Sequence, residues 1–545
     1  MDTMSEIGKW IQKSVPLILA FGLVVLILLR IEVATQRFFD VDEFTHMHWA
    51  AQVFMGEKPY IDFFTFFPPG YHWLLQPLFI LFKDSANIFI AGRFLSFFAF
   101  TGILVVLCAF FARLRSIKYA LLPVVILAFL PMPYDKYFEI RPDTWSTFLG
   151  FVGVLLLSFG WGELRKRDLS FGVRDSRLSK TNMLFLTAGV TFAVCLLVLP
   201  KMLPFVMVAG LVEVGRTVVE VVKQMMDRNS GFNIRNKKTQ RELLHILEPL
   251  LFLTLGGIII AGVFFVWMVS LGNFSTVWYS LTKEGIEGNQ IGKLFIMEPH
   301  LFFFPNSSFY GGEGITLSYV TNHAIWFLAI IVGTIRLFTP FLTVQNNKTS
   351  ILDELVLTGI FFVSVYGYIY YFPLKHTQYL IPIAVFISFY AADGMAAFFE
   401  KVRTVHSAAI QSIPTVIVVL LVIVGIAVNR ELNTRKLMWK NTDQLKEYTQ
   451  LLQTVPRDAT VVDLEGKMLT WKHGYYVCCL AFGQFGYLLS HPLPNFSESL
   501  KNNNVTYIYQ GDSGRLPTVS AADLSYINQY YAPVDGWYGK LLKRK

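Results

Sequence analysis

The chain has 545 residues, of which 54% are hydrophobic and 16% are charged, and its mean hydropathy is +0.48. Soluble domains average about 25% charged residues, so this composition excludes an ordinary soluble protein and predicts an α-helical polytopic membrane protein. The formal net charge of +9 does not indicate a nucleic-acid partner. The lysines and arginines lie in short loops between apolar segments, where they set the orientation of the spans.

Apolar segments of roughly 20 residues, long enough to cross the hydrocarbon core, recur through residues 1–428. Basic residues favour the cytoplasmic side, so Lys9 and Lys13 place the N-terminus inside. The segments that follow predict about eleven transmembrane helices and a C-terminus outside. The predicted spans are 15–33, 88–111, 120–132, 144–160, 183–199, 203–222, 250–271, 324–343, 355–372, 378–399 and 413–428.

Residues 34–87 form the first outer loop of this topology. The loop contains a shorter apolar stretch, 71–82, which at roughly 12 residues favours an interfacial or re-entrant segment over a span. The basic residues between 113 and 118 support this interpretation, because they are cytoplasmic only if 71–82 does not cross the membrane.

Residues 429–545 are polar and contain strand-like runs at 459–464 and 505–510, after a stretch that favours a helix. This pattern predicts a small extracytoplasmic α/β domain. The cysteines of the chain show no metal-ligand spacing, and the redox state of the adjacent pair stays open. They are Cys108, Cys195, Cys478 and Cys479.

The first outer loop opens with acidic residues and histidines beside aromatic side chains. The run contains Asp40, Asp42, Glu43, His46 and His48. Apolar neighbours partly desolvate a carboxylate, which suits a general base. The alternative is a solvated loop whose acids cap the following helix. A divalent-metal site formed by the two histidines with Asp42 and Glu43 is a further alternative, although this spacing is unspecific.

Other charged or polar residues lie at the outer ends of later spans. They are Arg141 and Asp143, then Lys201, and then Lys375, His376 and Tyr379. Each acid or base singly is equally compatible with a helix-start acid or a snorkelling cation. Together with Asp42 they map to one side of the membrane, so the topology predicts a phosphate-and-sugar site at the outer leaflet.

The first outer loop resembles that of family 39-type glycosyltransferases, which have the GT-C membrane fold and include protein O-mannosyltransferases and lipid A aminoarabinose transferases. The matching residues are Asp42-Glu43, Ala50, Gly56, Pro59-Tyr60, Asp62, Pro68-Pro69-Gly70 and Gly92-Arg93. Arg141-Pro142-Asp143 resembles the second-loop acidic motif of the family, and Lys201 resembles a lysine after the fifth span. The run from Lys375 to Pro382 resembles a late basic-plus-tyrosine motif.

Two departures argue against particular members of this family. Phe66 and Phe67 precede the paired prolines, where aminoarabinose transferases usually carry a lysine. The middle of the chain has only the polar loop 272–322, where eukaryotic protein mannosyltransferases carry a large inserted domain.

The resemblance implies an inverting glycosyltransferase of a bacterial plasma membrane that moves a sugar from a polyprenyl-phosphate donor to a hydroxyl of a lipid, glycan or protein. The reaction would take place on the extracytoplasmic face. Asp42 would be the base, with Glu43 and Asp143 as further catalytic residues. The implied ligands of the donor phosphate are Arg141, Lys201, Lys375, His376 and Tyr379. The cofactor that stays open is a divalent metal.

Two other functions fit the composition. A transporter or flippase of lipid-linked sugars usually carries charged groups near the bilayer midplane and shows repeat symmetry, whereas this chain has its charges at the outer edge and no visible repeat. A non-catalytic subunit, with the C-terminal domain as a binding module, is disfavoured by the Asp42-Glu43 pair.

Overall fold

The computed structural model describes residues 2–169, 180–226, 237–288, 314–342, 351–372, 376–405, 407–479, 489–511, 516 and 519–545. Its long helices are α1 (Asp2–Gln36), α4 (Asn87–Leu114), α6 (Pro142–Leu169), α7 (Lys180–Val198), α8 (Leu203–Met226), α9 (Lys237–Ser270), α13 (Leu317–Leu342), α14 (Ile351–Tyr366), α15 (Ile381–Arg403) and α16 (Ala408–Lys436).

Shorter helices connect them. They are α2 (Val41–Phe54), α3 (Gly70–Phe82), α5 (Leu121–Phe129), α10 (Phe274–Tyr279) and α11 (Gly285–Gly288). Single 3-10 turns form η1 (Ile117–Tyr119), η2 (Pro200–Met202) and η7 (Thr377–Leu380), and π-helical turns form η3 (Ser280–Glu284) and η6 (Gly367–Tyr371).

Within the described residues, nine helical segments are long and apolar enough to cross a membrane. The prediction of a polytopic helical membrane protein is therefore confirmed, and the nine segments match nine of the expected spans. The other two expected spans are helical but differ in character. The segment 117–129 is short, and α8 carries the ion pair of Glu213 and Arg216 midway along its length.

The short α5 ends among buried side chains, where its last carbonyl groups need partners. The last four carbonyls of a helix have no intrahelical donor, and lipid supplies none. Arg30 of α1, which is fully buried, meets this need. Its Nε donates to the Ala128 carbonyl at 2.7 Å, and its Nη2 lies 3.4 Å from the carbonyl of Leu130. A buried arginine thus makes a half-length helix tolerable inside the bundle.

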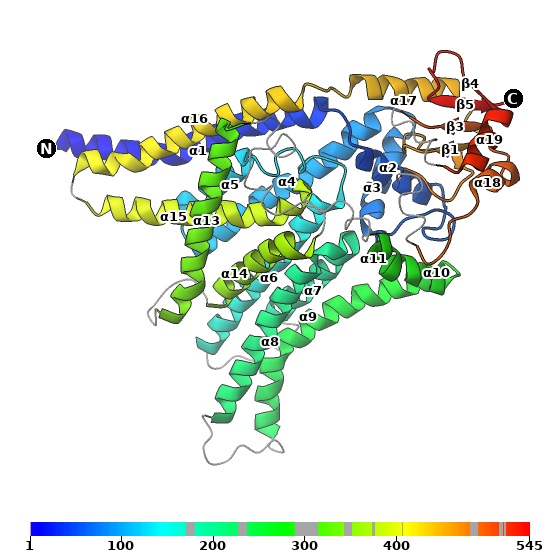
Figure 1. The fold of residues 1–545 in the computed structure, drawn as a ribbon. Coiled ribbons are helices and arrows are strands. Elements are labelled where there is room, and N and C mark those ends of the chain that lie inside the picture. Colours follow the sequence, from blue (N-terminus) through cyan, green and yellow to red (C-terminus); the bar gives the residue numbers. More distant parts are fainter. Residues whose placement is uncertain are drawn as a thin grey trace.

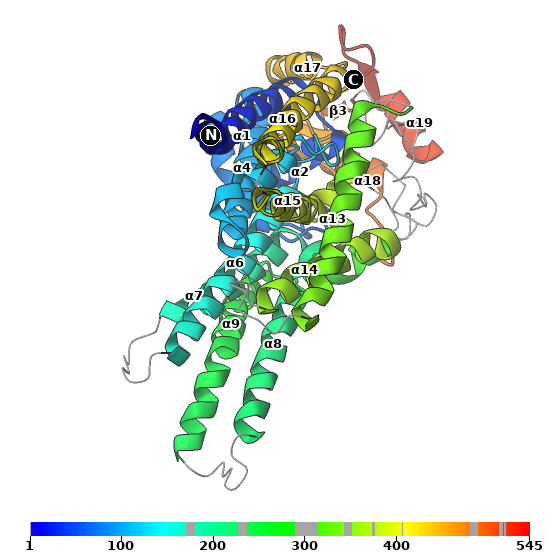
Figure 2. The same cartoon turned by 90° about the vertical axis from the view of Figure 1, so that its left-hand side faces the viewer.

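Helices α7 and α9 cross closely at glycines. A Cβ atom added to Gly189 would lie 2.0 Å from the Leu253 carbonyl oxygen, and one added to Gly256 would lie 2.2 Å from that of Leu186. Small residues allow such backbone approach between membrane helices. Figure 2 shows α8 and α9 side by side, extending beyond the other helices.

Helix α3 corresponds to the apolar stretch 71–82, which the sequence analysis predicts not to cross the membrane. Its 13 residues rise about 20 Å, which is less than the ~30 Å thickness of the hydrocarbon core. It packs against α2 and α4. An interfacial position for α3 stays a prediction.

The C-terminal domain is a small α/β unit, as expected. Its sheet has the strand order β2-β1-β3-β5-β4, with β1 parallel to β2 and β3, and β5 antiparallel to β3 and β4. The strands are β1 (Thr460–Asp463), β2 (Lys472–His473), β3 (Tyr507–Tyr509), β4 (Tyr531–Pro533) and β5 (Leu541–Arg544), and the helices are α17 (Thr442–Thr454), α18 (Phe496–Asn502) and α19 (Ala521–Tyr530). Both predicted strand runs coincide with strands, β1 and β3. The helix α16 continues past residue 429 as far as Lys436.

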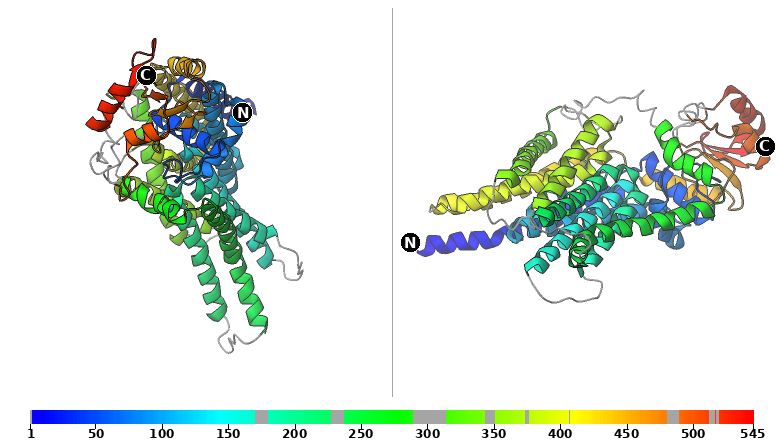
Figure 3. Two further views of the ribbon diagram at one scale, coloured as in Figure 1. Left: turned by 90° about the vertical axis from the view of Figure 1, so that its right-hand side faces the viewer. Right: turned by 90° about the horizontal axis from the view of Figure 1, so that it is seen from below.

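This domain lies at one end of the helices, against the first loop. Figure 1 shows the strands gathered beside α2 and α3, and the N-terminus at the opposite end of the molecule. The view from below in Figure 3 shows the same separation of the two termini. The side of a membrane on which each end lies stays a prediction.

Candidate functional site

Asp40 starts α2 and leaves Asp42 free of the capping role. The Asp40 carboxylate accepts a hydrogen bond from the Asp42 backbone N–H at 3.1 Å, and the Glu43 carboxylate accepts one from the Asp40 backbone N–H at 2.9 Å. These reciprocal bonds form a capping box, which satisfies donors that a helix start leaves unpaired. The helix-capping alternative is therefore correct for Asp40, two residues before the proposed base.

Glu43 is fully buried and joins three segments. Its two carboxylate oxygens accept from Nε and Nη2 of Arg93, on α4, at 2.8 and 2.7 Å. The backbone N–H of Ile140, just before α6, donates to the same carboxylate at 3.1 Å. Paired arginine–carboxylate bonds of this kind are strong and fix geometry. The Glu43 carboxylate therefore holds α2 in place against α4 and α6.

Asp42 has the opposite environment. Its side chain is 49% exposed, and one carboxylate oxygen pairs with Nη2 of the buried Arg141. The same arginine lies 3.3 Å from Asp40 and 2.8 Å from Glu139. Arg141 is thus held by three carboxylates, of which the Asp42 carboxylate is the most exposed.

A second group forms around Lys201 and Tyr379. Lys201 lies on η2 between α7 and α8, and its Nζ donates to the Tyr379 hydroxyl at 2.8 Å. The ammonium also lies 4.0 Å from the centre of the Tyr379 ring. The His376 ring lies 5.7 Å from the same ring, centre to centre. Lys201 and the motif with His376 and Tyr379 are separate in the sequence analysis, and the fold brings Lys201 to Tyr379 across 178 positions.

Electrostatics connect the two groups. The pKa of His376 is lowered, first by burial and then by the positive charges of Arg141 and Lys201, while Asp42 acts to raise it. Arg141 and Lys201 also act electrostatically on Asp143, at the start of α6. The described residues of the predicted site therefore gather in one region. Lys375, the remaining predicted ligand, lies outside the described residues.

A buried ionic network supports this region, and sequence reasoning missed two of its members, Arg37 and Lys136. Lys136 bridges Glu139 at 2.6 Å and Asp40 at 3.8 Å. Burial acts to raise the pKa of Asp40, but Arg141 and Lys136 outweigh it, so that the pKa is lowered. Arg37 continues the network, at 2.7 Å from Glu139. A usable signal was present in the sequence, because Lys136 and Glu139 sit only a few residues before Arg141.

The structure does not assemble the metal site that the first-loop histidines suggested. His46 packs among aromatic rings, with ring centres 5.2 Å from Phe67 and 5.4 Å from Tyr71. His48 instead faces the C-terminal domain, where its ring centre lies 4.2 Å from that of His473. Residues two positions apart on an α-helix, such as His46 and His48, are rotated by about 200° around its axis. The two imidazoles therefore point in different directions. In the described part of the chain, His48 alone of the pair belongs to a metal-compatible group.

The C-terminal domain forms hydrogen bonds with the loop that carries Asp42. The Gln444 side chain forms two bonds to the Phe39 backbone, accepting from its N–H at 2.6 Å and donating to its carbonyl at 2.9 Å. Further along the loop, the Tyr476 hydroxyl donates to the Tyr60 carbonyl at 2.7 Å. These bonds position the start of α2 from the side of the C-terminal domain.

Comparison with known proteins identifies the fold. No family model matches the chain, and no curated protein matches it. Among solved structures, the chain is similar to the Archaeoglobus fulgidus oligosaccharyltransferase tethered to an acceptor peptide, with a TM-score of 0.50 and 12% sequence identity. The match covers 96% of this chain and 73% of the oligosaccharyltransferase chain. ArnT from Cupriavidus metallidurans bound to undecaprenyl phosphate has a TM-score of 0.45 and 12% identity, with coverages of 90% and 87%.

At this identity the likeness to the oligosaccharyltransferase establishes a shared fold and nothing beyond it. The GT-C-like fold expected from the first-loop motif is thereby confirmed. The weaker likeness to ArnT supports no further conclusion.

Proposed function

We propose that this protein is a membrane glycosyltransferase, which moves a sugar from a polyprenyl-phosphate donor to a hydroxyl acceptor on the side where the C-terminal domain lies. The main support is that the half-exposed carboxylate of Asp42 lies in one region with the cations Arg141 and Lys201, at one end of the helices. The shared fold with an oligosaccharyltransferase supports the same class of reaction.

In this proposal Asp42 takes the acceptor proton. As the acceptor oxygen attacks the anomeric carbon, its proton passes to the Asp42 carboxylate, and the bond between that carbon and the phosphate oxygen breaks. The polyprenyl phosphate leaves with the bonding electrons. A general base must reach the proton within hydrogen-bond distance, and the 49% exposure of Asp42 leaves its carboxylate accessible to an acceptor.

The leaving phosphate needs positive charge rather than a general acid. Fixed cations stabilise charge that develops in a transition state, and Lys201 and Arg141 are held in fixed positions by Tyr379 and by the carboxylates. His376, whose lowered pKa makes the ring neutral, would contribute a hydrogen bond. Lys375 precedes it in the sequence and remains a proposed phosphate ligand.

The remaining two acids have supporting roles in this proposal. Glu43 orients Asp42, because its carboxylate binds Arg93 and the Asp40 backbone without facing solvent. Asp143, which is near enough to Lys201 and Arg141 to interact with their charges, would orient the acceptor or a divalent metal. A divalent metal stays an open part of the proposal.

The test uses purified full-length protein in detergent with undecaprenyl-phosphate sugars that differ in the sugar, and a panel of hydroxyl acceptors. Release of undecaprenyl phosphate that depends on the acceptor, and is lost in Asp42→Asn, supports the transferase. Transport of an intact labelled lipid-linked sugar across vesicles, without release of undecaprenyl phosphate, contradicts it and favours the flippase alternative.

A further inference from the structure

A second cluster of metal-binding side chains lies where α2 meets the C-terminal domain. His48 comes from α2, Asp463 ends β1, and His473 ends the neighbouring parallel strand β2. One ligand atom from each of the three residues lies within 4.8 Å of the others. The two strands bring their residues together because the carboxyl ends of parallel neighbours meet at one sheet edge.

The Asp463 carboxylate is held rigidly in this cluster. It accepts hydrogen bonds from the backbone N–H groups of Glu465 and Gly466 at 2.9 and 2.8 Å, and from that of Met468. Gly466 has a φ of +94°, and a Cβ atom there would lie 2.9 Å from the Phe44 backbone. The turn therefore requires glycine, and it brings α2 directly against the carboxylate.

The cluster contains buried polar atoms that lack partners. Within the described part of the chain, Nδ1 of His48 and Nε2 of His473 form no hydrogen bond. His48 is 1% exposed and Asp463 is fully buried. Among the described residues, no lysine or arginine forms an ion pair with Asp463, and Nδ1 of His48 lies 3.9 Å from its carboxylate. A buried carboxylate without a cation, facing two unpartnered imidazole nitrogens, is costly unless something binds there.

We propose that His48, Asp463 and His473 bind a transition-metal ion of the Zn²⁺ class. Two imidazoles and one carboxylate are common zinc ligands, and tetrahedral Zn²⁺ places their atoms about 3.3 Å apart. The 3.9 Å between His48 and Asp463 requires only a small closure. The backbone bonds to Asp463 act as the outer shell that orients a metal ligand.

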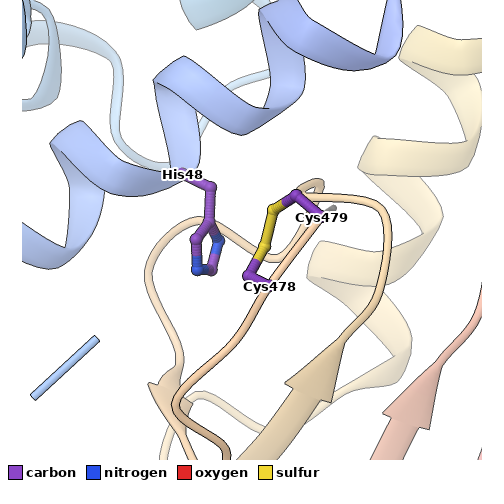
Figure 4. A group of neighbouring side chains, drawn as sticks. All are labelled: His48, Cys478 and Cys479. Atoms are coloured by element: carbon purple, nitrogen blue, oxygen red, sulfur yellow. A yellow bond between two sulfur atoms is a disulfide. The ribbon is translucent and has the colours of Figure 1, made fainter. Parts of the chain in front are cut away.

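A pair of cysteines borders this cluster. Figure 4 shows the His48 imidazole beside the disulfide between Cys478 and Cys479. The sulfur atoms lie within 4.8 Å of a His48 nitrogen. As a disulfide, the pair supplies no thiolate, so the metal site consists of the nitrogen and oxygen ligands alone, with the fourth position left to water.

Such an ion would fasten the C-terminal domain to the helix that begins at Val41. His48 lies six positions beyond Asp42 on α2, so the metal would restrain the helix that carries this carboxylate. The inference does not depend on the proposed glycosyl transfer, because metal binding is measured without donor or acceptor.

The test measures binding of Zn²⁺ and Co²⁺ to full-length protein in detergent after treatment with a chelator. The wild type should retain one Zn²⁺ through dialysis and give the visible absorption of tetrahedral Co²⁺. His48→Ala, Asp463→Asn and His473→Ala should each weaken Zn²⁺ binding at least about tenfold. His245→Ala is the matched control, because that histidine is 59% exposed on α9, and it should bind like the wild type.

Two further measurements keep folding defects separate from ligand loss. Zn²⁺ should raise the melting temperature of the wild type, since an ion that binds only the folded state stabilises that state. The melting temperatures of the three ligand variants should not change with Zn²⁺. The double variant Cys478→Ser, Cys479→Ser should still bind Zn²⁺. Absence of tight binding by the wild type, equal binding by the ligand variants, or loss of binding in the double serine variant overturns the proposal.

Discussion

Arg141 pairs with Asp42 although 99 positions separate them in the chain. The arginine is itself buried and anchored by Glu139 at 2.8 Å, so its position does not depend on Asp42. Arg141 therefore orients the half-exposed Asp42 carboxylate. We expect Arg141 to stay in place when Asp42 is substituted. This arrangement makes Asp42 a clean target for substitution.

Asp42→Asn should lower turnover by about a hundredfold or more, because the amide keeps the size of the side chain but removes its basicity. Binding of undecaprenyl phosphate should stay within a few-fold of the wild type. The measurement is release of undecaprenyl phosphate from its glycosylated form under single-turnover conditions. Near-normal turnover would mean that the base is another residue, and Asp143→Asn would then be compared next.

Lys201→Ala should weaken binding of undecaprenyl phosphate by roughly tenfold or more, because a hydrogen bond to a charged group contributes about 1.5–3 kcal/mol. Tyr379→Phe removes only the hydroxyl that holds the ammonium and should have a smaller effect. Native mass spectrometry or lipid titration measures both. Equal losses of affinity in both variants would indicate that Tyr379 contacts the lipid itself.

His376→Gln should keep most of the affinity for undecaprenyl phosphate, within about threefold, because the lowered pKa of His376 makes the imidazole a neutral hydrogen-bonding group. Glutamine can supply such a bond without charge. Lipid titration at neutral pH measures the change. A loss as large as that of Lys201→Ala would show that the histidine binds as a cation.

Glu43→Gln should destabilise the protein by about 3 kcal/mol, since it leaves the buried Arg93 without its charged partner. Asp42→Asn is the matched control, one position away on the same helix, and should change stability little because the side chain is half exposed. Unfolding in mixed micelles with increasing SDS measures both. If Glu43→Gln is as stable as the control, Glu43 does not have the structural role argued from its contacts.

The predicted topology has its own test. Reporter fusions after Arg115 and after Lys545 should give a cytoplasmic signal at the first position and an extracytoplasmic signal at the second. A cytoplasmic signal at Lys545 would place the C-terminal domain and Asp42 on the inner side, where a lipid-linked donor for outer-face transfer is not expected.

The sequence by itself determined the features that depend on local pattern. Apolar runs of bilayer length identified nine helices that the described part of the structure confirms as long and apolar enough to span, and short strand-like runs identified β1 and β3. Charge asymmetry placed Asp42, Arg141 and Lys201 on one side, and the structure brings them into one region. The helices and strands could be predicted because the length and residue types of a run are properties of neighbouring residues.

Only the tertiary structure decided which of the charged residues contact one another. The sequence could not assign the cap to Asp40 rather than Asp42, nor bind Glu43 to Arg93. It grouped His46 with His48, whereas the fold turns His48 toward His473, more than four hundred positions away. The physical reason is that such contacts are set by how distant helices and strands pack, and no local pattern encodes that packing.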